Sequence, residues 1–202
     1  RLSFLFQEKD KTVRFAFSLA NIGVDISNHS WIKEADIVHI HWINGGFLSL
    51  KNMNQILTKK KNVLWTLHDM WLFTGGCHYA GACKNFKKMC GNCPMLKKPS
   101  DNDLSNRIWN KKWNIFSRNN LNIVTCSRWL SAEASSSQLL KNANISSIPN
   151  PISLTQFKPE DKKFIRKKWN ITNEPFLLLF GAANVQDKRK GFSYLIDAMR
   201  LL

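Results

Sequence analysis

Residues 62–69 read Asn-Val-Leu-Trp-Thr-Leu-His-Asp, a short apolar run that stops at two polar side chains. A run of this length, rich in apolar, β-branched and aromatic residues, is typical of a buried β-strand. Open α/β sheets bind their ligands at the carboxyl ends of the strands. His68 and Asp69 end this predicted strand and are therefore candidate site residues.

Strand-like and helical patterns alternate along the first three quarters of the chain. Further strand-like runs occur at residues 36–42, 122–126 and 145–148. Predicted helices lie between them, at residues 47–57, 103–118 and 128–140. This order predicts an α/β fold. Residues 70–100, between the second and third strands, form an insertion without a single acidic residue.

A proline-rich segment follows the fourth predicted strand. Pro149, Pro151 and Pro159 fall within eleven residues, and neither a helix nor a central strand continues through such a segment. We therefore expect a linker and two domains, 1–157 and 158–202. In the second domain the sequence predicts a helix over 160–169, a buried strand over 176–183 and a helix over 191–202.

The chain carries an excess of positive charge. Its 202 residues include 30 Lys and Arg but 14 Asp and Glu, a net charge of +16. Such a charge favours anionic partners. However, 22 of the 30 basic residues are lysines, whereas arginine is preferred for bidentate recognition of bases and phosphates. A functional basic face and a Lys-rich solvated surface both fit this composition.

The sequence shows neither a membrane-spanning run nor a secretory signal. No apolar run approaches the roughly 18 to 20 residues that span a bilayer, and the first residues do not read as a secretory signal. We therefore expect a cytoplasmic protein. The final helical pattern stops without a cap, and the chain reads as cut at both ends.

Four cysteines lie within seventeen residues of the insertion. Cys77, Cys83, Cys90 and Cys93 have the spacing C-x5-C-x6-C-x2-C. Four thiolates suit a structural zinc ion, and the last pair has the close spacing of a zinc knuckle. Small buried residues packing an irregular loop are the alternative. Disulfides are disfavoured without an export signal.

Other polar residues also suggest sites. His39 and His41 alternate with apolar residues on one strand, which favours satisfied core histidines beside a cleft over a metal pair. In the second domain a strand ending at Gly181 is followed by Lys188, Arg189 and Lys190. A helix beginning near such residues is suited to bind a diphosphate.

Seven segments together resemble the bacterial retaining glycosyltransferases of family 4, also called group 1. The resemblance extends from about residue 20 to the end, and within the family the chain most resembles the branch that carries a T-G-G-C-H-Y motif and a cysteine-loop insertion. The segments are DIVHIHW (36–42), WTLHDMW (65–71), TGGCHY (74–79), CGNCP (90–94), SRWL (127–130), IPNPI (148–152) and RKGF (189–192).

The resemblance implies the GT-B architecture, in which two Rossmann-like domains face each other across a cleft. The first domain mainly holds the acceptor, a saccharide or lipid-linked molecule. The second mainly holds the nucleoside diphosphate sugar. Family members are longer, so the resemblance implies a fragment that lacks the first βα units and most of the donor domain. Polysaccharide or lipopolysaccharide synthesis is the implied role, with peripheral contact to an anionic membrane at its inner face.

The resemblance also assigns residues. His68 matches the histidine that hydrogen-bonds the donor sugar, and Lys190 matches the lysine that neutralises the departing diphosphate. The further candidates for substrate binding are Asp69, Gly75, Gly76, Ser127, Gly181 and Arg189. The family arginine after the strand-ending glycine is replaced by Ala182 or Ala183, and the family's E-x7-E pair would lie past Leu202.

The implied reaction is sugar transfer with the anomeric configuration retained and with no catalytic cofactor or metal. Front-face attack lets the leaving phosphate accept the acceptor's proton, so charge stabilisation and positioning matter more than a protein base. Two other hypotheses remain open. A basic, zinc-containing nucleic-acid binder would show basic residues interleaved with exposed aromatic residues along one face, and a truncated transferase remnant would be inactive.

Overall fold

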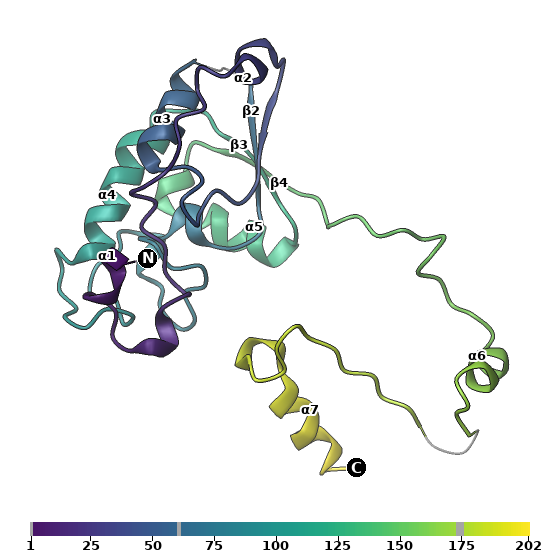
Figure 1. Cartoon of the computed structure of the whole chain (residues 1–202). Coiled ribbons are helices and arrows are strands. Elements are labelled where there is room, and N and C mark those ends of the chain that lie inside the picture. The colour runs from purple at the N-terminus through teal and green to yellow at the C-terminus, as the bar shows by residue number, and fades with distance from the viewer. Residues whose placement is uncertain (1, 60–61, 173–175) are drawn as a thin grey trace. The chain divides into compact units, whose positions relative to one another are not determined.

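The computed structural model describes residues 2–59, 62–172 and 176–202. The chain divides into two compact units, Arg1–Pro151 and Ile152–Leu202 (Figure 1). Each unit is described by itself below.

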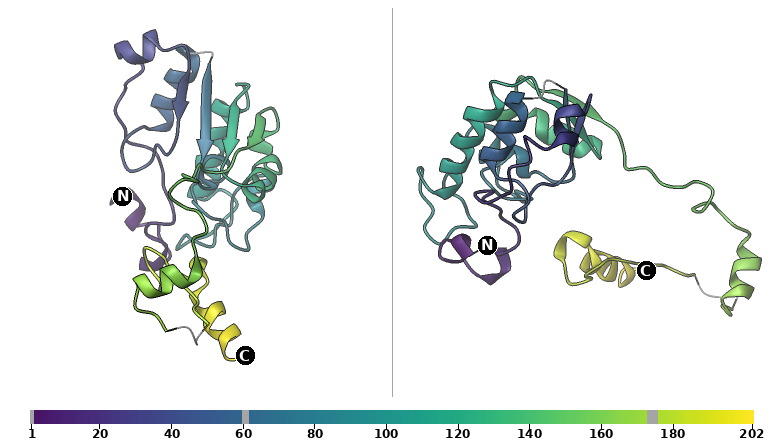
Figure 2. Two further views of the ribbon diagram at one scale, coloured as in Figure 1. Left: turned by 90° about the vertical axis from the view of Figure 1, so that its right-hand side faces the viewer. Right: turned by 45° about the horizontal axis from the view of Figure 1, so that its top comes forward.

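The first unit is built on a four-stranded parallel sheet. Its strands are β1 (Val38–Ile40), β2 (Val63–Leu67), β3 (Asn122–Thr125) and β4 (Asn144–Ser147), in the spatial order β1-β2-β3-β4. All neighbouring pairs are parallel, as Figure 2 shows for the central strands. The four strands predicted from the sequence for this part of the chain are therefore confirmed.

Helices connect the strands and cover one face of the sheet. They are α3 (Leu50–Lys59), α4 (Leu104–Phe116) and α5 (Arg128–Ser135). Right-handed crossovers between successive parallel strands place all three helices on one face. On that face Val63, Trp65 and Leu67 are buried, and the Trp65 ring meets that of Phe116 edge-on, with centroids 5.8 Å apart. The opposite face carries the exposed His39 and the half-buried Thr66.

Helix α5 is shorter than the predicted helix over 128–140. It ends at Ser135, because the next turn leaves the helix to bind the insertion. The Ser137 hydroxyl donates to the carbonyl oxygens of Phe73 and Phe86, at 3.2 and 2.9 Å. A separate 3-10 turn then covers Gln138–Leu140.

The segment before β1 packs against the insertion. It contains α1 (Leu2–Leu5), a 3-10 turn (Lys11–Val13) and α2 (Ser30–Glu34). An antiparallel bridge joins Phe17 to Cys77, and another joins Glu8 to Leu96. Residues far apart in sequence therefore meet beside the carboxyl edge of the sheet.

The insertion itself has little regular structure but a well-buried interior. It contains 3-10 turns at Trp71–Phe73 and Asn85–Lys87, and Phe73 and Phe86 are buried with their ring centroids 5.7 Å apart. Aromatic burial and hydrogen bonds, rather than strands, hold this loop in place.

The second unit contains α6 (Lys162–Lys168), a 3-10 turn (Lys188–Lys190) and α7 (Phe192–Met199). The prediction of a buried strand over 176–183 is wrong. Its described residues form no strand, and Phe176 and Leu179 are each 99% exposed. A parallel strand requires a hydrogen-bonded neighbour, and the described residues of this unit supply none.

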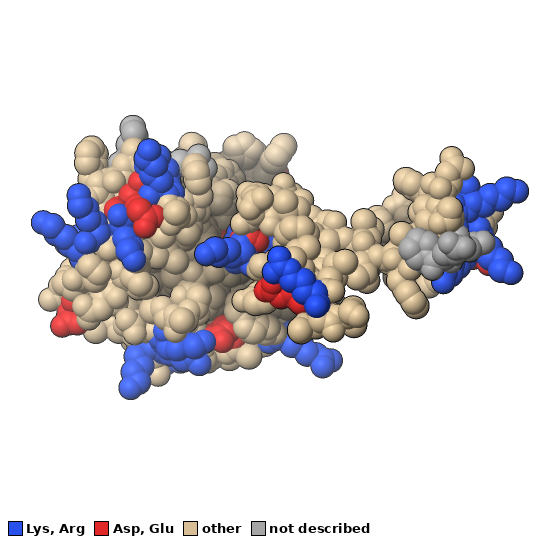
Figure 3. Space-filling model, turned by 90° about the horizontal axis from the view of Figure 1, so that it is seen from below, with Lys and Arg blue, Asp and Glu red and all other residues tan. Residues whose placement is uncertain are grey.

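Two surface properties bear on function. No helix in the described ranges combines the length and the apolar composition that a membrane crossing requires. On the face in Figure 3, Lys and Arg side chains form several separate groups interspersed with Asp and Glu. This view shows no single basic stripe.

Candidate active site at the carboxyl edge of the sheet

Two histidines pair where β1 and β2 end. His41 Nδ1 lies 2.9 Å from His68 Nε2, and their stacked rings have centroids 5.3 Å apart. One nitrogen of this hydrogen bond must carry the proton and the other must accept it. The parallel pairing of β1 and β2 brings the two side chains together, so each orients the other at the open edge.

The first histidine of β1 is satisfied but is not a core residue. His39 Nε2 lies 2.8 Å from the Thr66 hydroxyl, and both His39 and His41 are exposed. Partial burial, assisted by the neighbouring His41, lowers the pKa of His39. The expectation of core histidines is corrected, because the face of the sheet that carries them has no helix packed over it among the described residues.

Asp69, His78 and Ser18 form a continuous hydrogen-bonded chain. Asp69 Oδ2 lies 2.7 Å from His78 Nδ1, and Ser18 Oγ lies 2.8 Å from His78 Nε2. The other Asp69 oxygen accepts from the Trp71 amide at 2.8 Å. The carboxylate therefore favours the tautomer that donates from Nδ1 and leaves Nε2 as an acceptor.

The backbone fixes Ser18 against this chain. Its amide donates to the Gly76 carbonyl, and its own carbonyl accepts from Trp71 Nε1, both at 2.8 Å. Sequence reasoning missed both Ser18 and His78 as site residues. The T-G-G-C-H-Y motif contained a signal for His78, but nothing local marks Ser18, which lies sixty positions from its partner.

A cavity of about 470 Å³ adjoins the hydrogen bonds that join Asp69, His78 and Ser18. It is lined by Ser18, His78, Trp42 and Asn44. A smaller one, lined by His41, His68 and Asp69, also includes Trp42 and Asn44. The Trp42 side chain is about half exposed. Asn44 is buried, and its Oδ1 has no hydrogen-bond partner among the described residues. An apolar ring and an unsatisfied carbonyl suit a ligand that presents hydroxyl groups.

Three of the predicted substrate-binding residues have structural roles here. A Cβ on Gly75 would lie 2.4 Å from the Ser105 carbonyl oxygen, and one on Gly76, where φ is +133°, would lie 2.4 Å from the Phe17 ring. Ser127 caps α5, accepting from the Leu130 amide at 3.2 Å. Contact of these residues with a substrate stays a prediction.

The second unit holds the other predicted residues. Arg189 Nη2 forms an ion pair with Asp187 Oδ2 at 2.6 Å, and its hydrogen bonds to that carboxylate lower the pKa of Asp187. A Cβ on Gly181 would meet nothing within 4 Å, and Gly191 has a φ of +77°. Asp187 neutralises part of the predicted anion site, so Lys188 and Lys190 become more important to it.

Burial disfavours the thiolate form of three cysteines of the insertion. Burial raises the pKa of Cys77 to about 11 and that of Cys90 to about 12, and it also raises the pKa of Cys93. In the described ranges, no group of three His, Cys, Asp or Glu side chains is already gathered about one point as a metal site.

Comparison with known proteins gives one relative. A stretch of 66 residues, 30% of this chain, is 35% identical to the "Putative colanic acid biosynthesis glycosyl transferase WcaC" of Escherichia coli (strain K12). The match covers 16% of that protein. No protein-family model matches the chain, and no solved structure matches it.

Proposed function

We propose that this chain carries the acceptor side of a glycosyltransferase. The proposed reaction moves a sugar from a nucleoside diphosphate sugar to a hydroxyl of a saccharide or lipid-linked acceptor, in the synthesis of a cell-surface polysaccharide. The supporting likeness is the 66-residue match to a colanic acid glycosyl transferase. The observation that carries the proposal is the gathering of His41, His68, Asp69 and His78 at the carboxyl edge of a parallel sheet, where the first three line the smaller cavity and His78 lines the larger one.

The two histidines at the strand ends and the larger cavity have proposed roles. His68 hydrogen-bonds the donor sugar, and His41 orients the imidazole of His68 through their 2.9 Å contact. Asp69 and His78 form a second, independently oriented pair. The larger cavity offers the Trp42 ring and the Asn44 carbonyl to the acceptor. Positioning of the two substrates then lowers the barrier without a protein nucleophile.

The finer parts of the proposal concern the family and the second unit. We assign the chain to the family 4 retaining transferases with GT-B architecture, with 1–157 on the acceptor side and 158–202 as the start of the donor side. Lys190, assisted by Arg189, would neutralise the diphosphate as it leaves. The leaving phosphate accepts the proton of the acceptor hydroxyl as the glycosidic bond forms. Neither a metal ion nor another cofactor takes part in that step.

Product analysis tests this proposal. The complete gene product is incubated with a panel of nucleoside diphosphate sugars and with saccharide and lipid-linked acceptors. Mass spectrometry is expected to detect one added sugar, and NMR is expected to show the donor's anomeric configuration in the product. An inverted product would exclude the family 4 assignment, and no product from any donor would remove the activity itself.

A further inference from the structure

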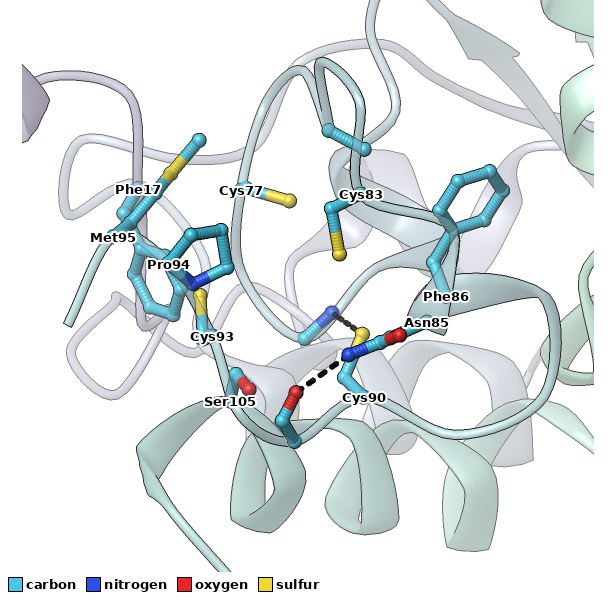
Figure 4. A pocket seen from close by; sticks show the side chains of 13 residues that line it. Phe17, Cys77, Cys83, Asn85, Phe86, Cys90, Cys93, Pro94, Met95 and Ser105 are labelled. Atoms are coloured by element: carbon cyan, nitrogen blue, oxygen red, sulfur yellow. Dashed lines mark hydrogen bonds between the residues drawn. The ribbon is translucent and has the colours of Figure 1, made fainter. Parts of the chain in front are cut away.

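Four cysteines of the insertion surround one small cavity. Figure 4 shows the side chains of Cys77, Cys83 and Cys90 pointing into a common space, with Cys93 at its edge. The cavity measures about 20 Å³, which is room for one particle of the size of a water molecule. The rest of its wall is mostly apolar and includes Phe17, Ala80, Phe86, Pro94 and Met95. An apolar cavity ringed by thiols is a poor site for water but a suitable one for a soft metal ion.

Hydrogen bonds fix the backbone of the close cysteine pair. The Cys93 amide donates to Asp103 Oδ2 at 2.8 Å, and Asn106 Nδ2 donates to the Cys90 carbonyl oxygen at 2.8 Å. Asp103 is also the N-cap of α4, so the start of that helix holds the pair in place. Asn92, between the two cysteines, has a φ of +48°, so the backbone turns sharply between them.

A backbone amide donates a hydrogen bond to one of the cysteine sulfur atoms. The Gly75 amide donates to Cys90 Sγ at 3.1 Å, and this hydrogen bond is drawn in Figure 4. An N–H group directed at a sulfur atom stabilises the charged thiolate rather than the neutral thiol. Because a Cβ at position 75 would lie 2.8 Å from the Cys90 Cβ, only a glycine allows this approach.

A buried cation lies close by without an acid bonded to it. Lys112 is fully buried, and the described acceptors of its ammonium group are the carbonyl oxygens of Trp71 and Thr74. The group also lies 3.6 Å from the centroid of the Trp71 ring. Burial lowers the pKa of Lys112 to about 7, and Cys77, Cys90 and Asp69 oppose that shift. A buried charge of this kind requires compensating negative charge nearby. Asp69 supplies part of that charge, and thiolates at Cys77 and Cys90 would add to it.

We propose that Cys77, Cys83, Cys90 and Cys93 bind one Zn²⁺ ion as four thiolates. Binding releases four protons to solvent, and the Zn²⁺ and four thiolates together carry a charge of −2, which Lys112 partly offsets. Zinc suits a tetrahedron of four sulfur ligands, and the cavity holds one ion rather than an iron–sulfur cluster. The side chains rotate inward to reach the ion, while the backbone turn at Cys90 and Cys93 is already held. The ion would tie the insertion to α4, and the proposal does not depend on transferase activity.

Metal analysis of the purified chain tests the proposal. Protein made in zinc-supplemented medium is measured for zinc, iron and other metals by mass spectrometry, and its reactive thiols are counted before and after chelation. We expect one zinc per chain, with one reactive thiol before chelation and five afterwards. Cys126 lies outside the cavity wall, so Cys126→Ser is the matched control and keeps the zinc. Cys83→Ser or Cys90→Ser lowers zinc content at least tenfold at equal free zinc.

A second measurement needs no variant and so does not depend on a variant's folding. Metal-free chain is titrated with Co²⁺, whose tetrahedral thiolate complexes absorb strongly in visible light, and Zn²⁺ is then added. We expect a rise in absorbance that saturates at one equivalent and disappears when zinc displaces cobalt. Absence of bound zinc together with absence of this absorbance in fully reduced protein would overturn the proposal. So would bound iron in place of zinc, or a disulfide among the four cysteines.

Discussion

Asp69 orients His78 through a 2.7 Å contact between Oδ2 and Nδ1, and the other imidazole nitrogen faces the Ser18 hydroxyl. Asp69 comes from the end of β2, His78 from the insertion and Ser18 from the segment before β1. Three separate parts of the chain therefore converge on one imidazole beside the larger cavity. This convergence makes His78 a positioned residue whose role can be tested through its partner.

Replacing Asp69 by Asn should misorient His78. The amide can present its NH₂ group to Nδ1 and so favour the opposite tautomer. We expect kcat to fall about 10- to 100-fold, as for other residues that orient a functional imidazole. Steady-state kinetics of the complete gene product measure this, and Asp69→Glu serves as the control by restoring part of the rate. An unchanged rate and pH profile in Asp69→Asn would mean that the hydrogen bonds among Asp69, His78 and Ser18 serve only to pack the loops together.

Replacing His68 should lower kcat/KM more than replacing His41. His68 is proposed to contact the donor, and His41 to act by orienting His68. His68→Ala should therefore lower kcat/KM, with a loss of roughly 3 kcal/mol of transition-state stabilisation. His41→Ala should cost less, and the double variant should be no worse than His68→Ala alone, since residues that act as a unit are non-additive. Additive losses in the double variant would argue that each histidine acts separately.

Replacing Lys190 should lower kcat/KM more than replacing Arg189. Arg189 is already paired with Asp187 at 2.6 Å, so Lys190 has more positive charge available to a diphosphate. Lys190→Ala should therefore cost on the order of 2 to 4 kcal/mol in kcat/KM, and Arg189→Ala should cost less. The comparison of the two variants on the same donor checks this, and the reverse order of losses would reject the assignment.

The turn at Gly76 should tolerate no side chain. A Cβ there would lie 2.4 Å from the Phe17 ring and would need a φ of +133°. We expect Gly76→Ala to lower the free energy of unfolding by roughly 2 to 4 kcal/mol, from overpacking and backbone strain together. Gly46→Ala is the matched control, because Gly46 also has a positive φ of +94° but a Cβ there meets nothing within 4 Å. Equal losses in urea unfolding would mean that the Phe17 contact contributes nothing.

The sequence allowed part of this description to be predicted. Short strand-like runs predicted all four strands of the first unit. Burial of apolar side chains explains the pattern of β1, β2 and β3, whereas β4 is mostly exposed. The same pattern made His68 and Asp69 candidates, and the substrate-binding role of His68, implied by the family resemblance, stays a prediction. The pairing of His78 with Ser18 could not be predicted, since a hydrogen bond across sixty positions depends on how the loops pack. The predicted strand at 176–183 failed for a related reason: an apolar run becomes a strand only beside another strand, and the described part of the second unit offers none.

The most direct test of the central claim is release of nucleoside diphosphate. The complete gene product and its His68→Ala variant are each incubated with a broad panel of nucleotide sugars, and free nucleoside diphosphate is quantified with and without acceptor. The proposed function predicts acceptor-dependent release from at least one donor, reduced about 100-fold in His68→Ala. No release from any donor by the folded complete protein would contradict the proposed function, and equal release by both proteins would contradict the assignment of His68.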